Sequence, residues 1–188
     1  MIEGEQQYIQ KAQHGDQEAF GTLYDHYFPQ IYRFVLFKVG SKAEAEDLTH
    51  EVFLSAWRTL PNYRMKGHPL SSWLYQIARN AVIDLYRTTK HHVQIEMVSE
   101  DVLRPVESGQ ESLDTTLEME QVQKCIAQLR PDYQDLIIMR FIEELPTAEI
   151  ATVLGKSEGA VRLMQHRALN DLKAVYHNTT HETPLHEA

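Results

Sequence analysis

The stretch "TAEIATVLGKSEGAVRLMQHRAL", residues 147–169, has the spacing of a helix-turn-helix. Ala151 is a small residue at the position where the two helices would cross closely. Gly155 follows four residues later, where the chain must turn through a left-handed conformation. Val161 and Met164 are the apolar positions expected to hold the second helix against Ile150 and Leu154. The alternative interpretation is a plain helical hairpin within a bundle.

The second helix of this motif is expected to begin after Ser157. A serine at an N-cap bonds the backbone amides of the first turn, and the other free amides can face a nucleic-acid groove. The polar and basic side chains that follow should point outward or along the flanks of the helix: Arg162, Gln165, His166 and Arg167.

A second informative stretch is "SSWLYQIARNAVIDLYR", residues 71–87. At 100° per residue it predicts an apolar core stripe of Leu70, Leu74, Ile77, Ala81 and Leu85. Beside it runs a seam of Trp73, Asn80 and Arg87, and the opposite side carries Tyr75, Arg79 and Tyr86. Flat rings alternating with guanidinium and amide groups suit unstacked bases on a phosphate backbone. The alternative is the central helix of a bundle, with its aromatic rings packed against neighbours.

The charge of the chain is unevenly distributed, although its net charge is −9. Residues 61–92 hold five Lys/Arg and one Asp, and residues 152–176 hold four bases and two acids. Between them, residues 93–120 hold one Arg and eight acids. Phosphate binding depends on the local field, so two basic patches separated by an acidic connector remain compatible with a nucleic-acid partner.

The helical periodicity and the scarcity of glycine and proline predict an all-α chain of two small domains. The expected organisation is an N-terminal helical bundle at 1–92, a flexible acidic linker at 93–113, a helix-turn-helix domain at 114–176 and a disordered tail at 177–188. Within the first domain, one helix starts after Asp16, another follows Pro29 and stops at Gly40, and a third starts after Ser41. The second domain is expected to contain helices at 115–129, 132–144, 147–154 and 157–176.

The single cysteine and the lack of a secretion signal or long apolar run indicate a cytoplasmic protein. Cys125 falls on the apolar side of a helix and is expected in the core. The ten histidines lack supporting ligands at metal-binding spacing, so we expect neither metal nor cofactor. No nucleophile–base pair, phosphate-binding loop or carboxylate cluster is present, so the sequence favours a binding protein over an enzyme.

Four motifs in this order resemble the extracytoplasmic-function (group 4) sigma factors of the sigma-70 family, which are bacterial RNA polymerase initiation subunits. They are "GDQEAFGTLYDHY", "AEDLTHEVFLSAW", "PLSSWLYQIARNAVIDLYR" and "EIATVLGKSEGAVRLMQHRAL". The resemblance covers residues 8–91 and 115–175. It implies a first domain that binds core polymerase and the melted minus-ten strand, and a second that reads the minus-thirty-five duplex.

The resemblance also implies roles for individual residues. Contact with the polymerase clamp coiled coil is expected at Glu44, Asp47, Glu51, Leu54 and Arg58, and the flap is a further expected contact of the protein. Minus-ten DNA is expected at Arg64, Lys66, Trp73, Arg79, Asn80 and Arg87. Minus-thirty-five DNA is expected at Ser157, Glu158, Arg162, Gln165, His166 and Arg167.

Two departures from the family pattern affect the promoter sequence rather than the role. Leu163 and Met164 replace the Ser-Arg pair of many members, and Pro146 replaces the usual capping serine. An anti-sigma factor is a common partner in the family, but no residue here identifies one. The rival interpretations are a stand-alone helix-turn-helix regulator and a helical protein-interaction adaptor without a nucleic-acid role.

Overall fold

The computed structural model describes residues 2–64, 67–93 and 121–181, without the side chains of 89–93 and 180–181. Regular structure within these residues is helical throughout. The chain divides into two compact units, Met1–Val106 and Glu107–Ala188, and each unit is described by itself. Most of the expected linker, residues 94–113, and Lys66 lie outside the described residues, as does the end of the expected tail from 182.

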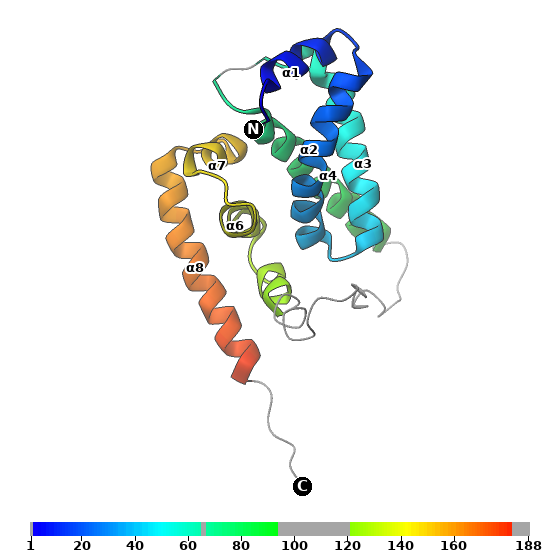
Figure 1. Ribbon diagram of the computed structural model, residues 1–188. Helices are drawn as coiled ribbons and strands as arrows, with labels where there is room; N and C mark the ends of the chain where they lie inside the picture. The colour runs from blue at the N-terminus through cyan, green and yellow to red at the C-terminus, as the bar shows by residue number, and fades with distance from the viewer. Residues whose placement is uncertain (1, 65–66, 94–120, 182–188) are drawn as a thin grey trace, which may run out of the picture. The chain divides into compact units, whose positions relative to one another are not determined.

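The first unit is a helical bundle (Figure 1). Its elements are α1 (Glu5–Gln13), α2 (Gln17–Val39), α3 (Lys42–Thr59), the 3₁₀ turn η1 (Leu60–Asn62) and α4 (Leu70–Val93). Helices α2, α3 and α4 pack against one another, whereas α1 packs on α2 and on η1. The unit therefore has one core, closed at one end by the short first helix.

The core of this bundle is tightly closed. Ile31, Phe34 and Val35 of α2 are fully buried, as is Val52 of α3. The ring of Phe34 meets Tyr75 of α4 edge to face, with the ring centroids 5.4 Å apart. Such a pair is worth about 0.5–1.5 kcal/mol beyond the apolar area that it buries.

The helix starts predicted after Asp16 and after Ser41 are confirmed. The backbone N–H of Ala19 donates to Asp16 Oδ1 at 3.0 Å, and that of Glu44 donates to Ser41 Oγ at 3.4 Å. Gly40 ends α2 in the left-handed conformation, with φ of 78°. Each acceptor satisfies an amide that would otherwise lack a partner at a helix start.

The predicted break at Pro29 is wrong, because Pro29 lies inside a continuous α2. A proline in a helix removes one hydrogen bond and crowds the carbonyl four residues earlier. That carbonyl belongs to Asp25, and both residues are exposed, so water can solvate the unpaired group. Burial of Tyr27 and Ile31 on the other side of the helix offsets the cost.

The predicted core stripe of α4 is also partly wrong. Leu70 and Leu74 are buried, but Ile77, Ala81 and Leu85 are only half-buried. The buried face instead includes Tyr75, Ala78 and Val82, with exposed fractions of 0–1%. Tyr75, which was expected on the far side, lies at its centre. The reason is that α4 contacts both α2 and α3, which covers a different and wider arc than one neighbour would.

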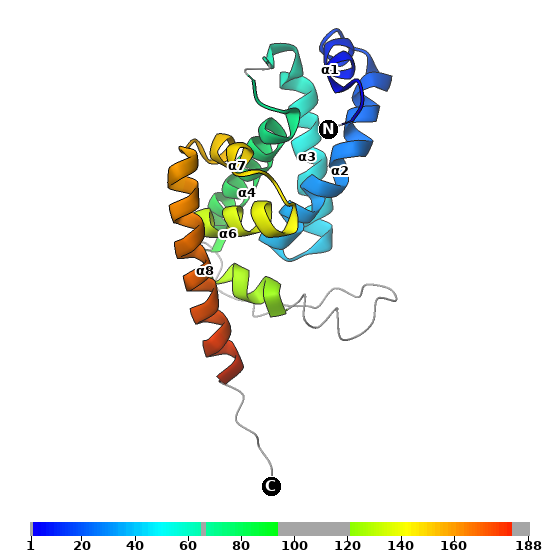
Figure 2. The same cartoon turned by 60° about the vertical axis from the view of Figure 1, so that its left-hand side comes forward.

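The second unit carries the helix-turn-helix. Residues 121–127 are helical, followed by α6 (Pro131–Ile137), the π-helical turn η2 (Ile138–Ile142), α7 (Thr147–Leu154) and α8 (Glu158–His181). Helices α6 and α7 both pack against α8, as Figure 2 shows from a second side. Cys125 is buried, as the sequence predicted.

The turn between α7 and α8 has the predicted form. Gly155 adopts φ of 62°, and Ala151, Val161 and Met164 are buried where the helices cross. Of the two residues on which the second helix was expected to rest, Ile150 is buried and Leu154 is only half-buried. The motif is therefore a helix-turn-helix with its own core.

Several helix boundaries differ from the prediction in this unit. The helix expected at 132–144 begins at Pro131 and changes to π geometry for its last five residues, after which Glu144 adopts a positive φ of 54°. The last helix continues to His181, so residues 177–181 are helical rather than part of a disordered tail. A helix that lies on a core over its first turns can extend beyond it by local hydrogen bonding alone.

None of the helices that the structure describes is long and apolar enough to span a membrane.

Replacing Pro29 with Ala should stabilise the first unit by about 1–3 kcal/mol, because the helix regains a hydrogen bond and loses a steric clash. Both tryptophans of the chain, Trp57 and Trp73, belong to this unit. Urea unfolding followed by tryptophan fluorescence would therefore report its stability. Thr22→Ala, at another exposed position of α2, is the control and should change stability by less than about 0.5 kcal/mol. A destabilised Pro29→Ala variant would contradict this explanation.

Candidate nucleic-acid interface

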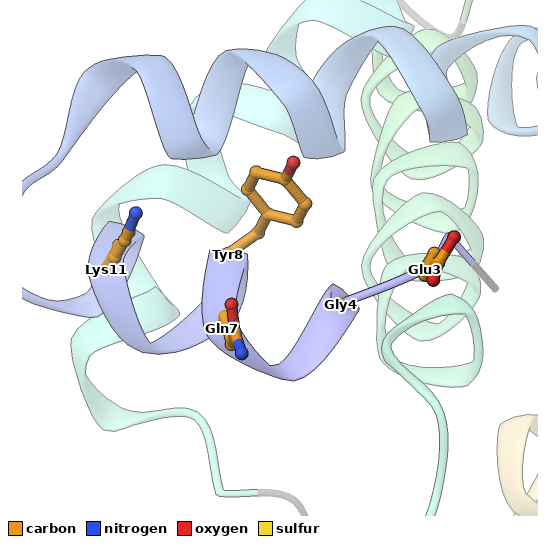
Figure 3. Close-up of a pocket in the computed structure, with 5 residues that line it drawn as sticks. All are labelled: Glu3, Gly4, Gln7, Tyr8 and Lys11. Atoms are coloured by element: carbon orange, nitrogen blue, oxygen red, sulfur yellow. The ribbon is translucent and has the colours of Figure 1, made fainter.

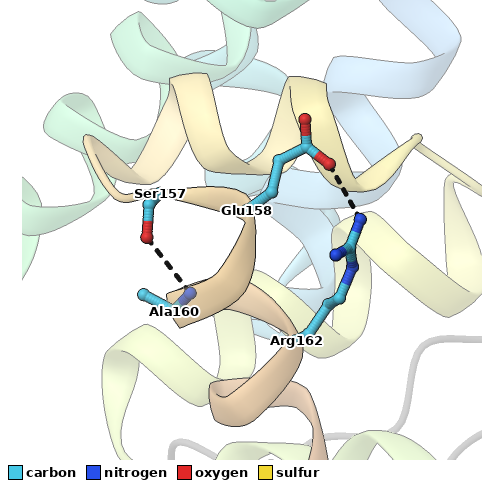
Figure 4. Close-up of polar contacts among 4 residues, drawn as sticks. All are labelled: Ser157, Glu158, Ala160 and Arg162. Carbon is cyan, nitrogen blue, oxygen red and sulfur yellow. Dashed lines mark hydrogen bonds and ion pairs between the residues drawn. The ribbon is translucent and has the colours of Figure 1, made fainter.

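The start of α8 presents exposed polar side chains at the protein surface. Ser157 Oγ accepts a hydrogen bond from the backbone N–H of Ala160 at 3.2 Å, as the sequence predicted for an N-cap (Figure 4). The Arg162 guanidinium lies one turn further on and donates to Glu158 Oε2 at 3.1 Å. This ion pair is exposed, so it contributes little stability and can open when a partner approaches.

The following turns of α8 continue this exposed surface. His166 and Arg167 are exposed, and Gln165 is half-buried. Leu163 is 54% exposed among these polar groups. An exposed leucine beside two arginines gives the helix both an apolar contact and charged donors, a combination suited to base edges and phosphates in a major groove.

The outer side of α4 carries the second surface. Asn80 and Arg87 are exposed, whereas Arg79 is half-buried. Arg87 Nη1 lies 3.6 Å from Asp84 Oδ1, but both side chains are largely in solvent. Their interaction is therefore weak, and the guanidinium remains accessible to a phosphate. Arg64, in the loop before the helix, is also exposed.

Trp73 is half-buried because a neighbour covers it. The ring of Tyr63 lies against it at a centroid distance of 4.7 Å and an interplanar angle of 38°. The sequence interpretation did not identify Tyr63, although an aromatic residue directly before Arg64 in a basic loop was a usable signal. The two rings form an aromatic surface between η1 and the start of α4.

A third surface lies along α3. The five side chains assigned to it from the sequence are all exposed: Glu44, Asp47, Glu51, Leu54 and Arg58. Leu54 has an exposed fraction of 54%. An exposed leucine among acidic groups suits a basic partner with an apolar contact point.

Glu44 has a further neighbour at the end of this surface. Burial, and then the Glu44 carboxylate, raise the pKa of Tyr86 on α4. The Tyr86 hydroxyl donates to the backbone carbonyl of Lys38. Glu44 therefore faces the junction of α2 and α4. Of the five side chains on the α3 surface, it is the one that also interacts with a residue of α4.

The described residues offer no metal-binding cluster of three or more His, Cys, Asp or Glu. A pocket beside α1 is lined by Glu3, Gly4, Gln7, Tyr8 and Lys11 (Figure 3). Its charged side chains, Glu3 and Lys11, are exposed, and no nucleophile is paired with a base in it.

Two family models match the two units. The model of sigma-70 region 2 matches residues 23–92, and that of sigma-70 region 4 matches residues 119–172. The sigma factor ShbA of Streptomyces griseus is 30% identical over 176 residues, which cover 89% of this chain and 92% of that protein. The chain belongs to the extracytoplasmic-function RNA polymerase sigma factors.

Other relatives agree with this assignment. BldN of Streptomyces coelicolor, another sigma factor of this family, is 37% identical over 169 residues, which cover 87% of this chain and 62% of that longer protein. Among solved structures, that of CnrH in complex with the cytosolic domain of CnrY is similar, with a TM-score of 0.71 and 24% identity. It covers 92% of this chain and 97% of that one. At this identity the similarity shows the fold alone.

Two alanine variants of α4 should differ in their effect on stability, because Trp73 is partly packed and Asn80 is exposed. Trp73→Ala should destabilise the first unit by about 1–3 kcal/mol, which is less than a fully buried tryptophan would cost, because part of the side chain is exposed to solvent. Asn80→Ala should change stability by less than about 0.5 kcal/mol, since the side chain is exposed. Thermal unfolding of both variants measures this. A loss of several kcal/mol for Asn80→Ala would show that it has a structural role.

Proposed function

We propose that this sigma factor binds core RNA polymerase through α3, reads the minus-thirty-five duplex with α8 and holds the melted minus-ten strand on the outer side of α4. The observation that carries this proposal is the pair of outward surfaces on separate units. One combines half-covered aromatic rings with an exposed amide and arginines, and the other is a capped helix start with exposed arginines. Single-stranded and double-stranded DNA require these two different surfaces.

The role of α8 follows from its exposed side chains. Arg162 and Arg167 can each donate two hydrogen bonds to guanine or to a phosphate, and Ser157 leaves amides of the first turn facing outward. Glu158 can accept a hydrogen bond from cytosine N4 once Arg162 has turned to the DNA. Gln165 and His166 add contacts along the flank of the helix.

The role of α4 follows from the position of its aromatic and amide groups. Trp73, with Tyr63 behind it, offers a face on which an extruded base can stack, and Asn80 can bond a base edge two turns further on. Arg64, Lys66, Arg79 and Arg87 supply positive charge to the phosphates of the same strand. The protein performs no catalysis of its own in this scheme, and it acts in the cytoplasm with the polymerase.

An anti-sigma factor is a further proposed partner. The CnrH structure and that of the sigma factor RpoE of Bartonella quintana with the anti-sigma factor NepR support this, because both contain a bound protein on the same fold. The RpoE chain has a TM-score of 0.66 to this chain and 22% identity, and covers 83% of it. The exposed leucines Leu54 and Leu163 are candidate contact points for such a partner.

The experiment that tests this function is reconstitution. The full chain is mixed with bacterial core polymerase and genomic DNA fragments, and the transcripts are sequenced. The proposal predicts co-purification with the core enzyme and transcripts that start at a restricted set of sites. A chain that binds duplex DNA but not core polymerase would instead be a stand-alone helix-turn-helix regulator.

The proposed polymerase surface can be tested by charge reversal. Asp47→Lys with Glu51→Lys should weaken binding of core polymerase at least about tenfold, since an acidic surface that meets a basic partner becomes repulsive. Glu18→Lys, at an exposed position of α2, is the matched control. Binding is measured by competition with a labelled sigma factor. Unchanged binding together with lower thermal stability would show that the two acids serve the fold.

The proposed recognition helix can be tested with single alanines. Arg162→Ala or Arg167→Ala should reduce transcription that depends on the minus-thirty-five element. An arginine that reads a base should cost about 1–3 kcal/mol and relax preference at one position, whereas one that contacts phosphate weakens all sequences alike. Lys173→Ala, two turns further along α8, is the control. Equal activity of the variants on promoters with and without the element would contradict the assignment.

A further inference from the structure

Gln13 connects the first helix to a distant turn of the bundle. It is the last residue of α1, and its Nε2 donates to the backbone carbonyl of Leu60 at 3.2 Å and to that of Tyr63 at 2.7 Å. These acceptors lie 47 and 50 residues away in the chain. One side chain therefore ties the end of α1 to the first residue of η1 and to the residue that follows this turn.

The residue that Gln13 holds is the one that covers Trp73. Tyr63 is half-buried, its ring lies 4.7 Å from that of Trp73, and its hydroxyl donates to the backbone carbonyl of His68 at 3.4 Å. Burial, and then the Glu5 carboxylate of α1, raise the pKa of Tyr63. Two residues of α1 thus act on Tyr63: Gln13 bonds its backbone carbonyl, and Glu5 acts on its hydroxyl group.

The chemistry of Gln13 is not easily replaced. Both of its bonds use amide N–H groups, which a glutamate of the same shape does not have. Without Gln13 the Leu60 carbonyl would still accept from the backbone N–H of Tyr63, whereas the Tyr63 carbonyl would have to move toward water or remain unsatisfied. Tyr63 carries one of the two carbonyls on its own backbone, so its ring would move with it and uncover Trp73.

We propose that Gln13 is a positioning residue for the melted-strand surface, because it fixes Tyr63 against Trp73 and so presets the ring on which a base stacks. This inference rests on the proposed function of α4. The geometry distinguishes Gln13 from its neighbours on the same helix. Gln7 and Lys11, on the face drawn in Figure 3, are exposed, as is Gln10. Gln13 is half-buried, and its amide bonds the backbone carbonyls of Leu60 and Tyr63.

The first test uses the free protein and needs no polymerase. A Trp57→Phe background leaves Trp73 as the one tryptophan, since the chain has two. In this background, Gln13→Ala and Gln13→Glu should raise the acrylamide quenching constant of Trp73 by roughly a factor of two, because one ring face loses its cover. Gln10→Ala is the matched control and should leave it unchanged. Unchanged quenching in both Gln13 variants would overturn the inference.

The second test uses the full chain with core polymerase. On duplex promoters, Gln13→Ala and Gln13→Glu should reduce open-complex formation by up to about tenfold, because a displaced ring can lose much of the ~1–3 kcal/mol that stacking one base contributes. On a template with the minus-ten bubble already mismatched, both should come within about twofold of the parent, because melting is no longer required. A general folding defect would instead lower activity equally on both templates, and that result would overturn the inference.

A double-mutant cycle tests whether Gln13 acts through Tyr63. If it does, adding Gln13→Ala to Tyr63→Ala should cause little further loss on duplex promoters, since the ring to be positioned is already absent. Additive losses would contradict the inference. If the parent chain opens no promoter at all, the proposed function fails, while the quenching experiment still decides whether Gln13 positions Tyr63.

Discussion

The contact between Phe34 and Tyr75 constrains most of the first unit, because it sets the rotation of α4 about its own axis. Each residue of an α-helix turns by about 100°, so burial of Tyr75 places Trp73 about 160° away and Asn80 about 140° away. Arg87 lies about 120° away on the same side. The same rotation of α4 therefore buries Tyr75 against Phe34 and turns the seam of aromatic, amide and guanidinium groups outward.

Sequence reasoning located this seam correctly but assigned the opposite face incorrectly. Trp73, Asn80 and Arg87 share a side at seven-residue spacing whatever packs behind them. Which apolar residues are buried depends on how many helices contact α4, and the pattern alone did not contain that information. A single neighbour would have covered Leu70 through Leu85, whereas two neighbours brought Tyr75 to the centre.

The remaining differences have similar local reasons. Caps at Asp16, Ser41 and Ser157 were predictable because they depend on adjacent residues. Pro29 was misleading because its cost depends on whether the carbonyl of Asp25 can reach water. Gln13 and Tyr63 were missed because the hydrogen bond between them spans 50 residues. Long-range contacts of a polar side chain with the backbone have no periodic signature in the sequence.

The two units present their functional groups in different ways, and this has mechanistic consequences. In α8 the exposed ion pair of Glu158 with Arg162 can exchange for DNA contacts at little cost. In the first unit the aromatic surface is preset, since Tyr63 already lies on Trp73 and is held by α1. Preorganisation of this kind lowers the entropy lost when a flexible single strand binds. If the two surfaces act as proposed, duplex recognition would remain adaptable, whereas strand capture would rely on a rigid surface.

The most direct measurement of this account compares Asn80→Ala with the parent protein on duplex and pre-melted promoters, with core polymerase in both cases. Asn80 is exposed and has no part in the core, so its loss should leave folding and polymerase binding intact. The account predicts markedly slower opening of the duplex promoter and near-normal activity on the pre-melted one. Parent-like activity on the duplex would remove Asn80 from the strand surface, and an equal defect on both templates would contradict a role in melting.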